Sequence, residues 1–219
     1  MAFFDWRTML LALPGILVAM TFHEYAHGVV ALRLGDPTAL RAGRLSPEPW
    51  AHIDWFGLLA LLIFGFGWAK PVPIDPRYFR HPRRDMMWVG LAGPVSNLVM
   101  AFAFALALGF WNRIAPASMV GGIGYYAAEV VDTAFVLNVA FGLFNLIPIP
   151  PLDGSRVLAG LVPGSVARAI YRLEPYGLVI LVLALVATPL LPAVLNPLRQ
   201  AVAGGLWSGA EWVVRGVLR

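Results

Sequence analysis

The sequence predicts an all-α polytopic membrane protein with about four to six transmembrane helices. Composition is the first reason: 59% of the 219 residues are hydrophobic and 13% are charged, whereas soluble domains are about half apolar and a quarter charged. The mean hydropathy of +0.74 agrees. The second reason is that long uncharged runs recur along the chain, separated by short polar connections. We therefore expect residues 1–219 to form one domain within a membrane.

Crossing a bilayer takes roughly 20 residues of helix, and four apolar runs meet that length: Thr8–Leu34, Met86–Asn112, Thr133–Leu152 and Pro175–Leu198. The prolines at the end of the third run should unwind it, because proline lacks the N–H that a helix needs. Phe56–Ala69 is shorter, so it either dips into the membrane and returns or crosses as a short buried helix. Residues 199–219 mix tryptophan with charge, which predicts an amphipathic tail helix along the interface.

The distribution of basic residues predicts the orientation, since lysine and arginine concentrate in cytoplasmic loops. Residues 33–84 hold eight of them, whereas only Arg113 lies between the second and third spans. The basic segments should be cytoplasmic on both sides of Phe56–Ala69, which favours re-entry of that run. The first span then ends in the cytoplasmic half of the bilayer. The expected location is the cell membrane, as a multi-pass protein.

A metal-binding pattern, His23-Glu24-Tyr25-Ala26-His27, lies inside the first span. Residues four apart share a helix face, so His23 and His27 can bind one metal ion. Glu24 can reach a zinc-bound water as general base, which is the arrangement of H-E-x-x-H hydrolases. Three polar groups at membrane depth are costly, and this favours a functional site. The chain has no cysteine, so any zinc site must use His, Asp or Glu.

Two histidines need a third ligand, and Asp153 is the candidate among the acidic residues. It follows a run with three prolines, Asn145 to Leu152, at the end of a predicted span. Non-helical backbone at membrane depth is tolerated only when it is buried in protein or lines a cavity. The broken helix end could therefore turn Asp153 inward. An ordinary Asp-Gly turn that ends the helix accounts for the same residues.

Taken together, the two motifs resemble those of the site-2 protease family of intramembrane zinc metalloproteases. H-E-x-x-H reads His23 to His27, and N-x-x-P-x-P-x-L-D-G reads Asn145 to Gly154, with every fixed position matched. Stretches at 43–54, 67–73 and 91–97 are similar as well, so the resemblance covers residues from about 8 to 160. Many relatives carry a PDZ or CBS domain. The 113–132 connection and the tail are too short for either, which suggests a short form.

The resemblance implies that His23, His27 and Asp153 are zinc ligands. It also implies that Glu24 is the catalytic carboxylate and that the Asn145 amide binds the substrate. It also implies a membrane-facing β-hairpin over Asp36–Trp55, able to pair with an extended substrate. The implied activity is regulated intramembrane proteolysis, in which a zinc-activated water attacks a peptide bond in a transmembrane segment. The cofactor is Zn²⁺. The expected partners are a membrane-protein substrate and the lipid bilayer, with no nucleic acid.

Two functions from other classes compete with proteolysis. A zinc-binding transporter or channel should distribute polar residues along several helices, but Met86–Asn112 and Pro175–Leu198 have few away from their ends. A catalytically inactive scaffold should have lost Glu24 or a ligand, and none is lost. The sequence therefore favours an enzyme, without indicating which membrane protein it cleaves or what its oligomeric state is.

Overall fold

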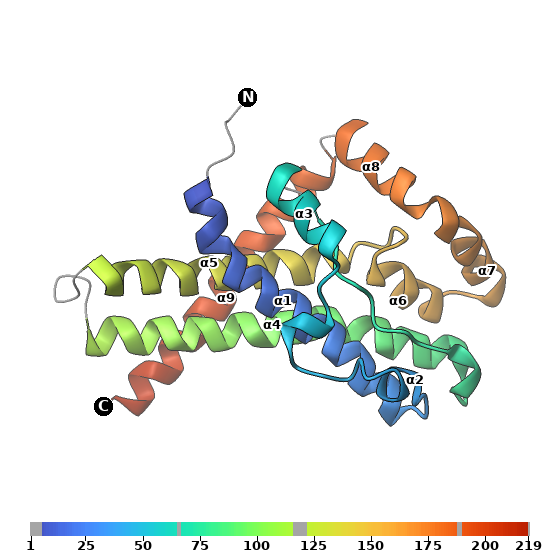
Figure 1. The fold of residues 1–219 in the computed structure, drawn as a ribbon, viewed down its shortest axis with the longest axis horizontal. Coiled ribbons are helices and arrows are strands. Elements are labelled where there is room, and N and C mark those ends of the chain that lie inside the picture. Colours follow the sequence, from blue (N-terminus) through green and yellow to red (C-terminus); the bar gives the residue numbers. More distant parts are fainter. Residues whose placement is uncertain (1–5, 65–66, 116–121, 188–189, 219) are drawn as a thin grey trace.

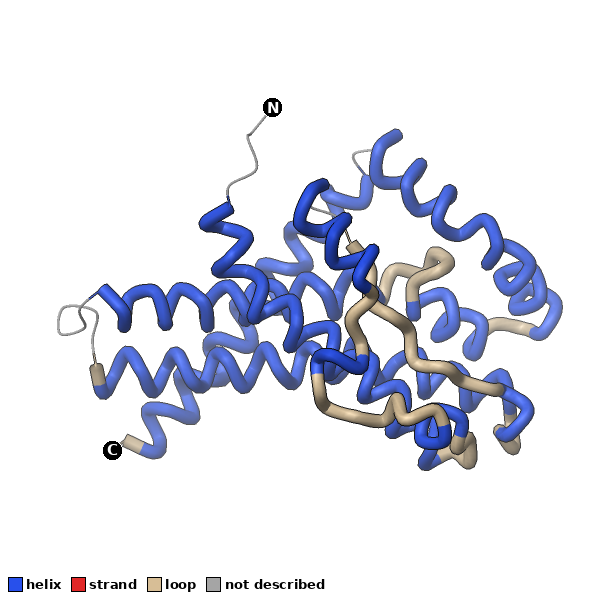
Figure 2. The backbone as a smooth tube through the Cα atoms, viewed as in Figure 1, coloured by secondary structure: helices blue, strands red, loops and turns tan. Residues whose placement is uncertain are grey.

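The computed structural model describes residues 6–64, 67–115, 122–187 and 190–218, and its regular elements there are all helical (Figure 2). The α-helices are α1 (Trp6–Arg33), α2 (Thr38–Arg41), α3 (Trp55–Phe64), α4 (Pro82–Ile114), α5 (Gly122–Asn145), α6 (Asp153–Leu161), α7 (Gly164–Leu173), α8 (Gly177–Ala187) and α9 (Leu190–Val217). The 3₁₀ turns are η1 (Pro49–Ala51), η2 (Pro76–Tyr78) and η4 (Glu174–Tyr176). The predicted all-α class is confirmed.

Helices α4 and α5 lie side by side, and α1 and α9 each cross this pair (Figure 1). The contact of α4, α5 and α9 is built on small and β-branched side chains, among them Ala101, Ala105, Val139 and Ala210. Small residues let helix backbones approach closely. Helices in a bilayer pack in this way because lipid is as apolar as the helices, so the hydrophobic effect does not drive them together. Outward-facing apolar side chains such as Leu10 and Val99 are 59% and 61% exposed.

Within the described residues, three helices are long and apolar enough to cross a membrane: α1, α4 and α5. They coincide with the first three predicted spans, although α5 begins at Gly122 rather than Thr133 and ends at Asn145 rather than Leu152. Its early start takes Glu129 and Asp132 into the helix. Glu129 is tolerated there because it pairs with Arg7 of α1, at an N–O distance of 3.5 Å.

The fourth predicted span, Pro175–Leu198, is not a single helix. Helix α8 ends at Ala187, and α9 begins at Leu190. Residues 188 and 189 lie outside the described part of the chain. The tail from residue 199 is helical as expected, but it is the continuation of α9, and Trp207 packs against the core of α4 and α5.

The β-hairpin expected over Asp36–Trp55 does not form. The segment holds α2 and η1, and its one strand-like contact among the described residues is an isolated antiparallel bridge between Ile53 and Ala69. Side chains, rather than a partner strand, accept the hydrogen bonds of the backbone amides. Asp36 accepts hydrogen bonds from the Thr38 and Asp75 amides at 2.9 and 2.7 Å. The glycines and prolines of this segment thus exclude a long helix without requiring strands.

The flanks of α3 lie against each other. Besides the bridge from Ile53 to Ala69, the Lys70 amide donates to the His52 carbonyl at 2.9 Å, and Arg44 Nη2 donates to the Lys70 carbonyl at 2.7 Å. The segments before and after α3 therefore lie next to each other, and the helix between them has 10 residues. Such a helix is about 15 Å long, half of the hydrocarbon thickness. Residues 65 and 66 of the predicted short run are not among those described.

After α5 the chain turns sharply over residues 146–152 before α6 begins, as the prolines predict. Short-range hydrogen bonds hold these turns, such as Ile149 N–H to the Ile147 carbonyl at 2.8 Å. Gly154 packs directly on them, since a Cβ there would lie 2.2 Å from the Leu146 carbonyl oxygen. The turns and this close approach bring Asp153, the first residue of α6, back against the helix bundle.

Candidate metal centre

Helix α1 places His23 and His27 one turn apart on its inward face. Both side chains are buried, with 4% of each residue exposed. Their rings are perpendicular to each other, with centroids 4.6 Å apart. The i, i+4 spacing therefore gives the shared face that the sequence predicts.

Asp153 meets the two histidines from α6. Its Oδ2 atom lies 2.9 Å from His23 Nε2 and 3.2 Å from His27 Nε2. One potential ligand atom from each of the three residues lies within 4.8 Å of the others, and all three residues are buried. The fold thus brings together, from positions 23, 27 and 153, the residues that the two motifs single out.

The opposite ring nitrogens fix the tautomers of the histidines. His27 Nδ1 lies 2.6 Å from the Val89 carbonyl oxygen, and His23 Nδ1 lies 2.7 Å from Asn97 Oδ1. Both oxygens can only accept, so each Nδ1 carries the hydrogen and donates it. In a neutral imidazole the remaining nitrogen, Nε2, then offers a lone pair. Those lone pairs face Asp153.

This donor set fits a zinc ion. Two imidazole nitrogens and a carboxylate oxygen converge, and Asp153 Oδ2 is buried without a hydrogen-bond partner. Lone pairs of three atoms at such separations repel unless a cation lies among them. Two histidines and one carboxylate are a common protein ligand set of catalytic zinc, which keeps a further position open.

The electrostatic setting of Asp153 favours its charged form. Burial alone disfavours the carboxylate, but when the Nε2 atoms of His27 and His23 carry protons, these two residues outweigh burial and hold the pKa of Asp153 well below its usual value. Arg156 adds a longer contact, from Nη1 to Asp153 Oδ1 at 3.5 Å. Asp153 is therefore available as an anionic ligand at neutral pH.

Helix α4 closes the back of the site at Gly93. A Cβ there would lie 2.6 Å from His23 Nε2 and 2.6 Å from His27 Cε1, so only glycine lets α4 pass behind the rings. One turn further along α4, Asn97 is completely buried and bonds His23. Its Nδ2 donates to the Ala19 carbonyl at 2.9 Å and to Asn138 Oδ1 at 3.2 Å, which fixes the direction of the amide.

Gly93, Asn97 and Asn138 are therefore part of the site, although neither of the two metal-binding motifs includes them. Outer-shell partners of this kind orient metal ligands. The sequence signal for these residues was the presence of a glycine and two asparagines within long apolar helices, where a polar side chain is costly and usually functional.

Glu24 is held differently from its two histidine neighbours. It is partly buried, and its Oε2 accepts a hydrogen bond from the Val72 amide at 2.8 Å. Val72 belongs to the irregular segment that follows α3, so this segment covers the acid. Oε1 has no hydrogen-bond partner among the residues that the structure describes.

Asn145 is the last residue of α5. Its Nδ2 donates to the carbonyl of Phe141, one turn earlier, at 3.0 Å. The Phe141 ring stands edge-on to His23, with centroids 5.5 Å apart. Because positions four apart share a helix face, Asn145 lies on the side of α5 that faces the metal centre.

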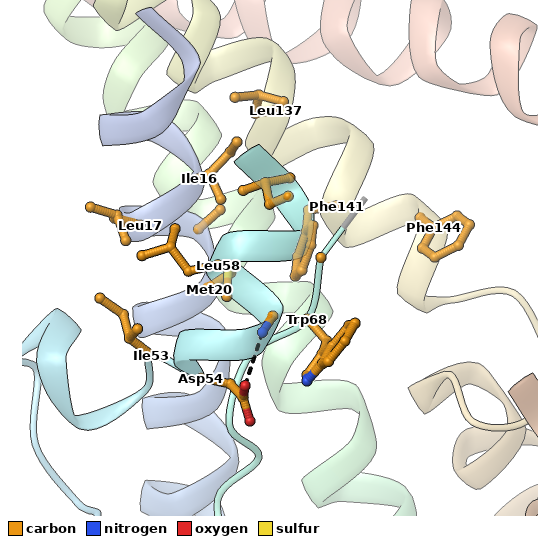
Figure 3. Close-up of a pocket in the computed structure, with 14 residues that line it drawn as sticks. Ile16, Leu17, Met20, Ile53, Asp54, Leu58, Trp68, Leu137, Phe141 and Phe144 are labelled. Atoms are coloured by element: carbon orange, nitrogen blue, oxygen red, sulfur yellow. Dashed lines mark hydrogen bonds between the residues drawn. The ribbon is translucent and has the colours of Figure 1, made fainter. Parts of the chain in front are cut away.

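An apolar cavity of about 460 Å³ adjoins the centre, between α1, α3 and α5 (Figure 3). Its walls include Leu17, Leu58, Trp68 and Phe141, and the same Phe141 contacts His23. Asp54 lies at its edge, where it accepts a hydrogen bond from the Gly57 amide at 2.9 Å. The cavity suits apolar side chains, and one of its wall residues, Phe141, separates it from the histidine pair.

Comparisons with known proteins point to the same chemistry. A model of peptidase family M50 matches residues 114–187. The chain is 39% identical over 186 residues to "Putative zinc metalloprotease YwhC" of Bacillus subtilis, with 85% of this chain and 84% of that protein covered. "Putative zinc metalloprotease Rip2" of Mycolicibacterium smegmatis is 31% identical, over 83% of this chain and 68% of its own length.

An archaeal protein, "Putative zinc metalloprotease MJ0611" of Methanocaldococcus jannaschii, is 28% identical, over 71% of this chain and 72% of its own. No solved structure gives a significant match.

Proposed function

The chain belongs to peptidase family M50, and on this basis we propose that it is a zinc endopeptidase that cleaves transmembrane segments of other membrane proteins within the bilayer. One observation carries the proposal. His23 and His27 lie buried in the C-terminal half of α1, a helix long and apolar enough to cross a membrane, and Asp153 joins them there. Metal ligands at that depth serve hydrolysis only if the peptide bond is brought to the same depth.

In this proposal His23, His27 and Asp153 hold the zinc. When bound, zinc polarises the scissile carbonyl and lowers the pKa of water toward about 7. Val89 and Asn97 hold the two imidazoles in the tautomer that ligation needs, through contacts of 2.6 and 2.7 Å. Gly93 has no side chain and therefore leaves the space that both rings occupy.

Glu24 is the proposed general base and acid. Its Oε2 is fixed by the Val72 amide, so Oε1 is the atom that would take a proton from the attacking water. The same carboxyl would return that proton to the leaving amine nitrogen, which separates as a neutral product. Because Val72 lies in the segment after α3, that segment also sets the position of the acid.

The substrate is proposed to bind as an unwound segment with apolar side chains in the cavity between α1, α3 and α5. Helical carbonyls are hydrogen-bonded and shielded, so a scissile bond must leave its helix before attack. Asn145 is proposed to hold the freed backbone: its Nδ2 is engaged by Phe141, and its Oδ1 accepts no bond from a described residue, so Oδ1 can accept a substrate N–H.

The proposed location is the cell membrane, with the site in the cytoplasmic half. Two arguments support this. The excess of Lys and Arg over residues 33–84 predicts a cytoplasmic side. The flanks of α3 pair at Ile53 and Ala69, which supports the proposal that the basic region lies on one side of the membrane and that the run containing α3 re-enters rather than crosses.

Cleavage in reconstituted liposomes tests the proposal. The substrates would be single-span peptides with a helix-breaking Asn-Gly pair at mid-membrane and matched all-leucine peptides, with products identified by mass spectrometry. We expect cuts inside the span of the first set. Glu24→Gln should abolish them, whereas Glu48→Gln, which changes an exposed acid, should not. Cleavage only outside the spans, or equal cleavage by Glu24→Gln, would overturn the proposal.

A further inference from the structure

A second cavity, of about 630 Å³, is lined by the start of α4 and by residues of α6 and α7, and one of its lining residues, Arg156, contacts Asp153 of the metal centre. In Figure 1 this is the end of the bundle marked by α6 and α7. Its polar lining consists of Arg83, Arg156, Arg168, Tyr171 and Glu174. Three guanidinium groups from three different helices therefore converge on one hollow with a single carboxylate.

Arg83 and Arg168 lie close together. A Cβ at Gly164 would be 3.3 Å from Arg83 Nη1 and 3.7 Å from Arg168 Nη1. Neither arginine has a carboxylate partner within the described ranges of the chain. Like charges at such separations repel each other and attract an anion. Gly164, which lines the cavity, also begins α7, whose N-terminus has no side-chain cap.

Arg156 is only loosely engaged. Its Nη1 lies 3.5 Å from Asp153 Oδ1, and its Nη2 lies 3.7 Å from Glu174 Oε1. Both distances exceed those of close charge-assisted hydrogen bonds, so the guanidinium retains donors for a third partner. Tyr171 adds a hydroxyl: burial and the nearby Glu174 raise the pKa of Tyr171, which keeps the group a neutral donor.

We propose that this cavity binds a phosphate group, carried by an anionic phospholipid or by a soluble phosphorylated molecule. A guanidinium group can donate two parallel hydrogen bonds to the oxygens of one phosphate, and here three such groups, those of Arg83 and Arg168 on exposed residues, line one hollow. The proposal does not depend on proteolysis: the cavity shares no lining residue with the apolar one beside the metal centre, and Arg156, which contacts Asp153, is left unchanged in the test below.

The surroundings of the cavity indicate how a lipid would reach it. Helix α7 exposes Val166 and Leu173, seven residues apart on one face, at 46% and 47%. Arg168 and Arg172 lie four apart on another face. Such a helix suits a membrane surface, with its apolar face toward acyl chains and its arginines at the headgroups. Basic pockets of this kind on the cytoplasmic side of a membrane protein bind anionic headgroups.

Two binding measurements test the site on purified wild-type protein and on Arg83→Ala, Arg168→Ala and Arg172→Ala. Arg172→Ala is the matched control, since it removes the same charge from the same helix one turn away and does not line the cavity. Native mass spectrometry from bilayers of equal phosphatidylglycerol and phosphatidylcholine measures retained lipid. Broadening of the ³¹P signal of pyrophosphate, in detergent free of phospholipid, measures a soluble ligand. Thermal unfolding checks each variant's fold.

We expect wild-type protein to retain phosphatidylglycerol over phosphatidylcholine. Arg83→Ala and Arg168→Ala should each reduce that retention about fivefold, as expected for one arginine near a charged headgroup, while Arg172→Ala should behave as wild type. Binding of pyrophosphate alone, with the same arginine dependence, would support the site and identify a soluble source. Equal losses in Arg172→Ala and Arg168→Ala, or binding of neither probe, would overturn the proposal. If Arg168→Ala does not fold, Arg83→Ala and Arg168→Gln carry the test.

Discussion

Replacing Asn97 with leucine should weaken zinc binding without unfolding the protein. Asn97 is completely buried, and its amide joins three helices: Oδ1 to His23 Nδ1 on α1, and Nδ2 to the Ala19 carbonyl and to Asn138 Oδ1 on α5. Leucine has nearly the same shape but no polar atom. His23 would keep its Nδ1 hydrogen without an acceptor, and its ring would no longer be held with Nε2 toward Asp153.

Two magnitudes describe the effect on the metal and the effect on the fold. Loss of an outer-shell partner costs about 10–100-fold in metal affinity, which is about 1.4–2.8 kcal/mol. Hydrogen bonds between helices in a bilayer are worth only about 0.6 kcal/mol on average, because the separated helices also find partners. Asn97→Leu removes three such bonds, so the free energy of unfolding should also fall, by about 1.8 kcal/mol. A control variant that loses stability without losing a contact to a histidine therefore isolates the effect on zinc.

The assay is competition for zinc between the purified protein and a fluorescent chelator of known affinity, with thermal unfolding measured in parallel. Asn138→Leu is the matched control: it removes the bond to Asn97 and one to the Ala134 carbonyl, but no contact with a histidine. It should lower stability to a similar extent and leave zinc affinity near wild type. Unchanged zinc affinity in Asn97→Leu, or an equal loss in Asn138→Leu, would refute the positioning role.

Three further predictions follow from the geometry of the site and of α3. Gly93→Ala should abolish zinc binding, because its Cβ would lie 2.6 Å from both imidazoles, whereas Gly209→Ala, with its nearest atom at 3.6 Å, should bind zinc normally; metal analysis of both proteins distinguishes them. Asn145→Ala should retain zinc and thermal stability but lose most cleavage of a transmembrane substrate; loss of zinc in that variant would indicate a structural role. Cysteines placed at Arg44 and Arg80 should both be labelled by a membrane-impermeant reagent from the cytoplasmic side, since the flanks of α3 pair; labelling from opposite sides would contradict re-entry.

The parts of the site that depend on local geometry were predictable from the sequence. His23 and His27 meet because helix periodicity alone puts them on one face. Asp153 needed the resemblance to a family, since its own surroundings also fit a simple turn. The structure brings it to the histidines through the proline-broken segment and the close approach of Gly154 to the Leu146 carbonyl.

The contributions of α4 could not be predicted, because they depend on the register between helices that are far apart in sequence. Nothing in an apolar helix says that Gly93 lies behind two imidazoles or that Asn97 bonds His23 across 74 positions. The expected hairpin over Asp36–Trp55 was wrong for a related reason. Glycine and proline exclude a long helix there, but Asp36 and neighbouring side chains satisfy the backbone without a partner strand.

Zinc content is the measurement that tests the central claim most directly. Wild-type protein, Glu24→Gln and Asp153→Ala would be purified identically, and zinc per chain would be determined by plasma mass spectrometry after dialysis against a weak chelator. We predict about one zinc per chain for wild type and for Glu24→Gln, and almost none for Asp153→Ala, as expected for a site of three protein ligands. Full zinc in Asp153→Ala would contradict the assignment of the centre to His23, His27 and Asp153.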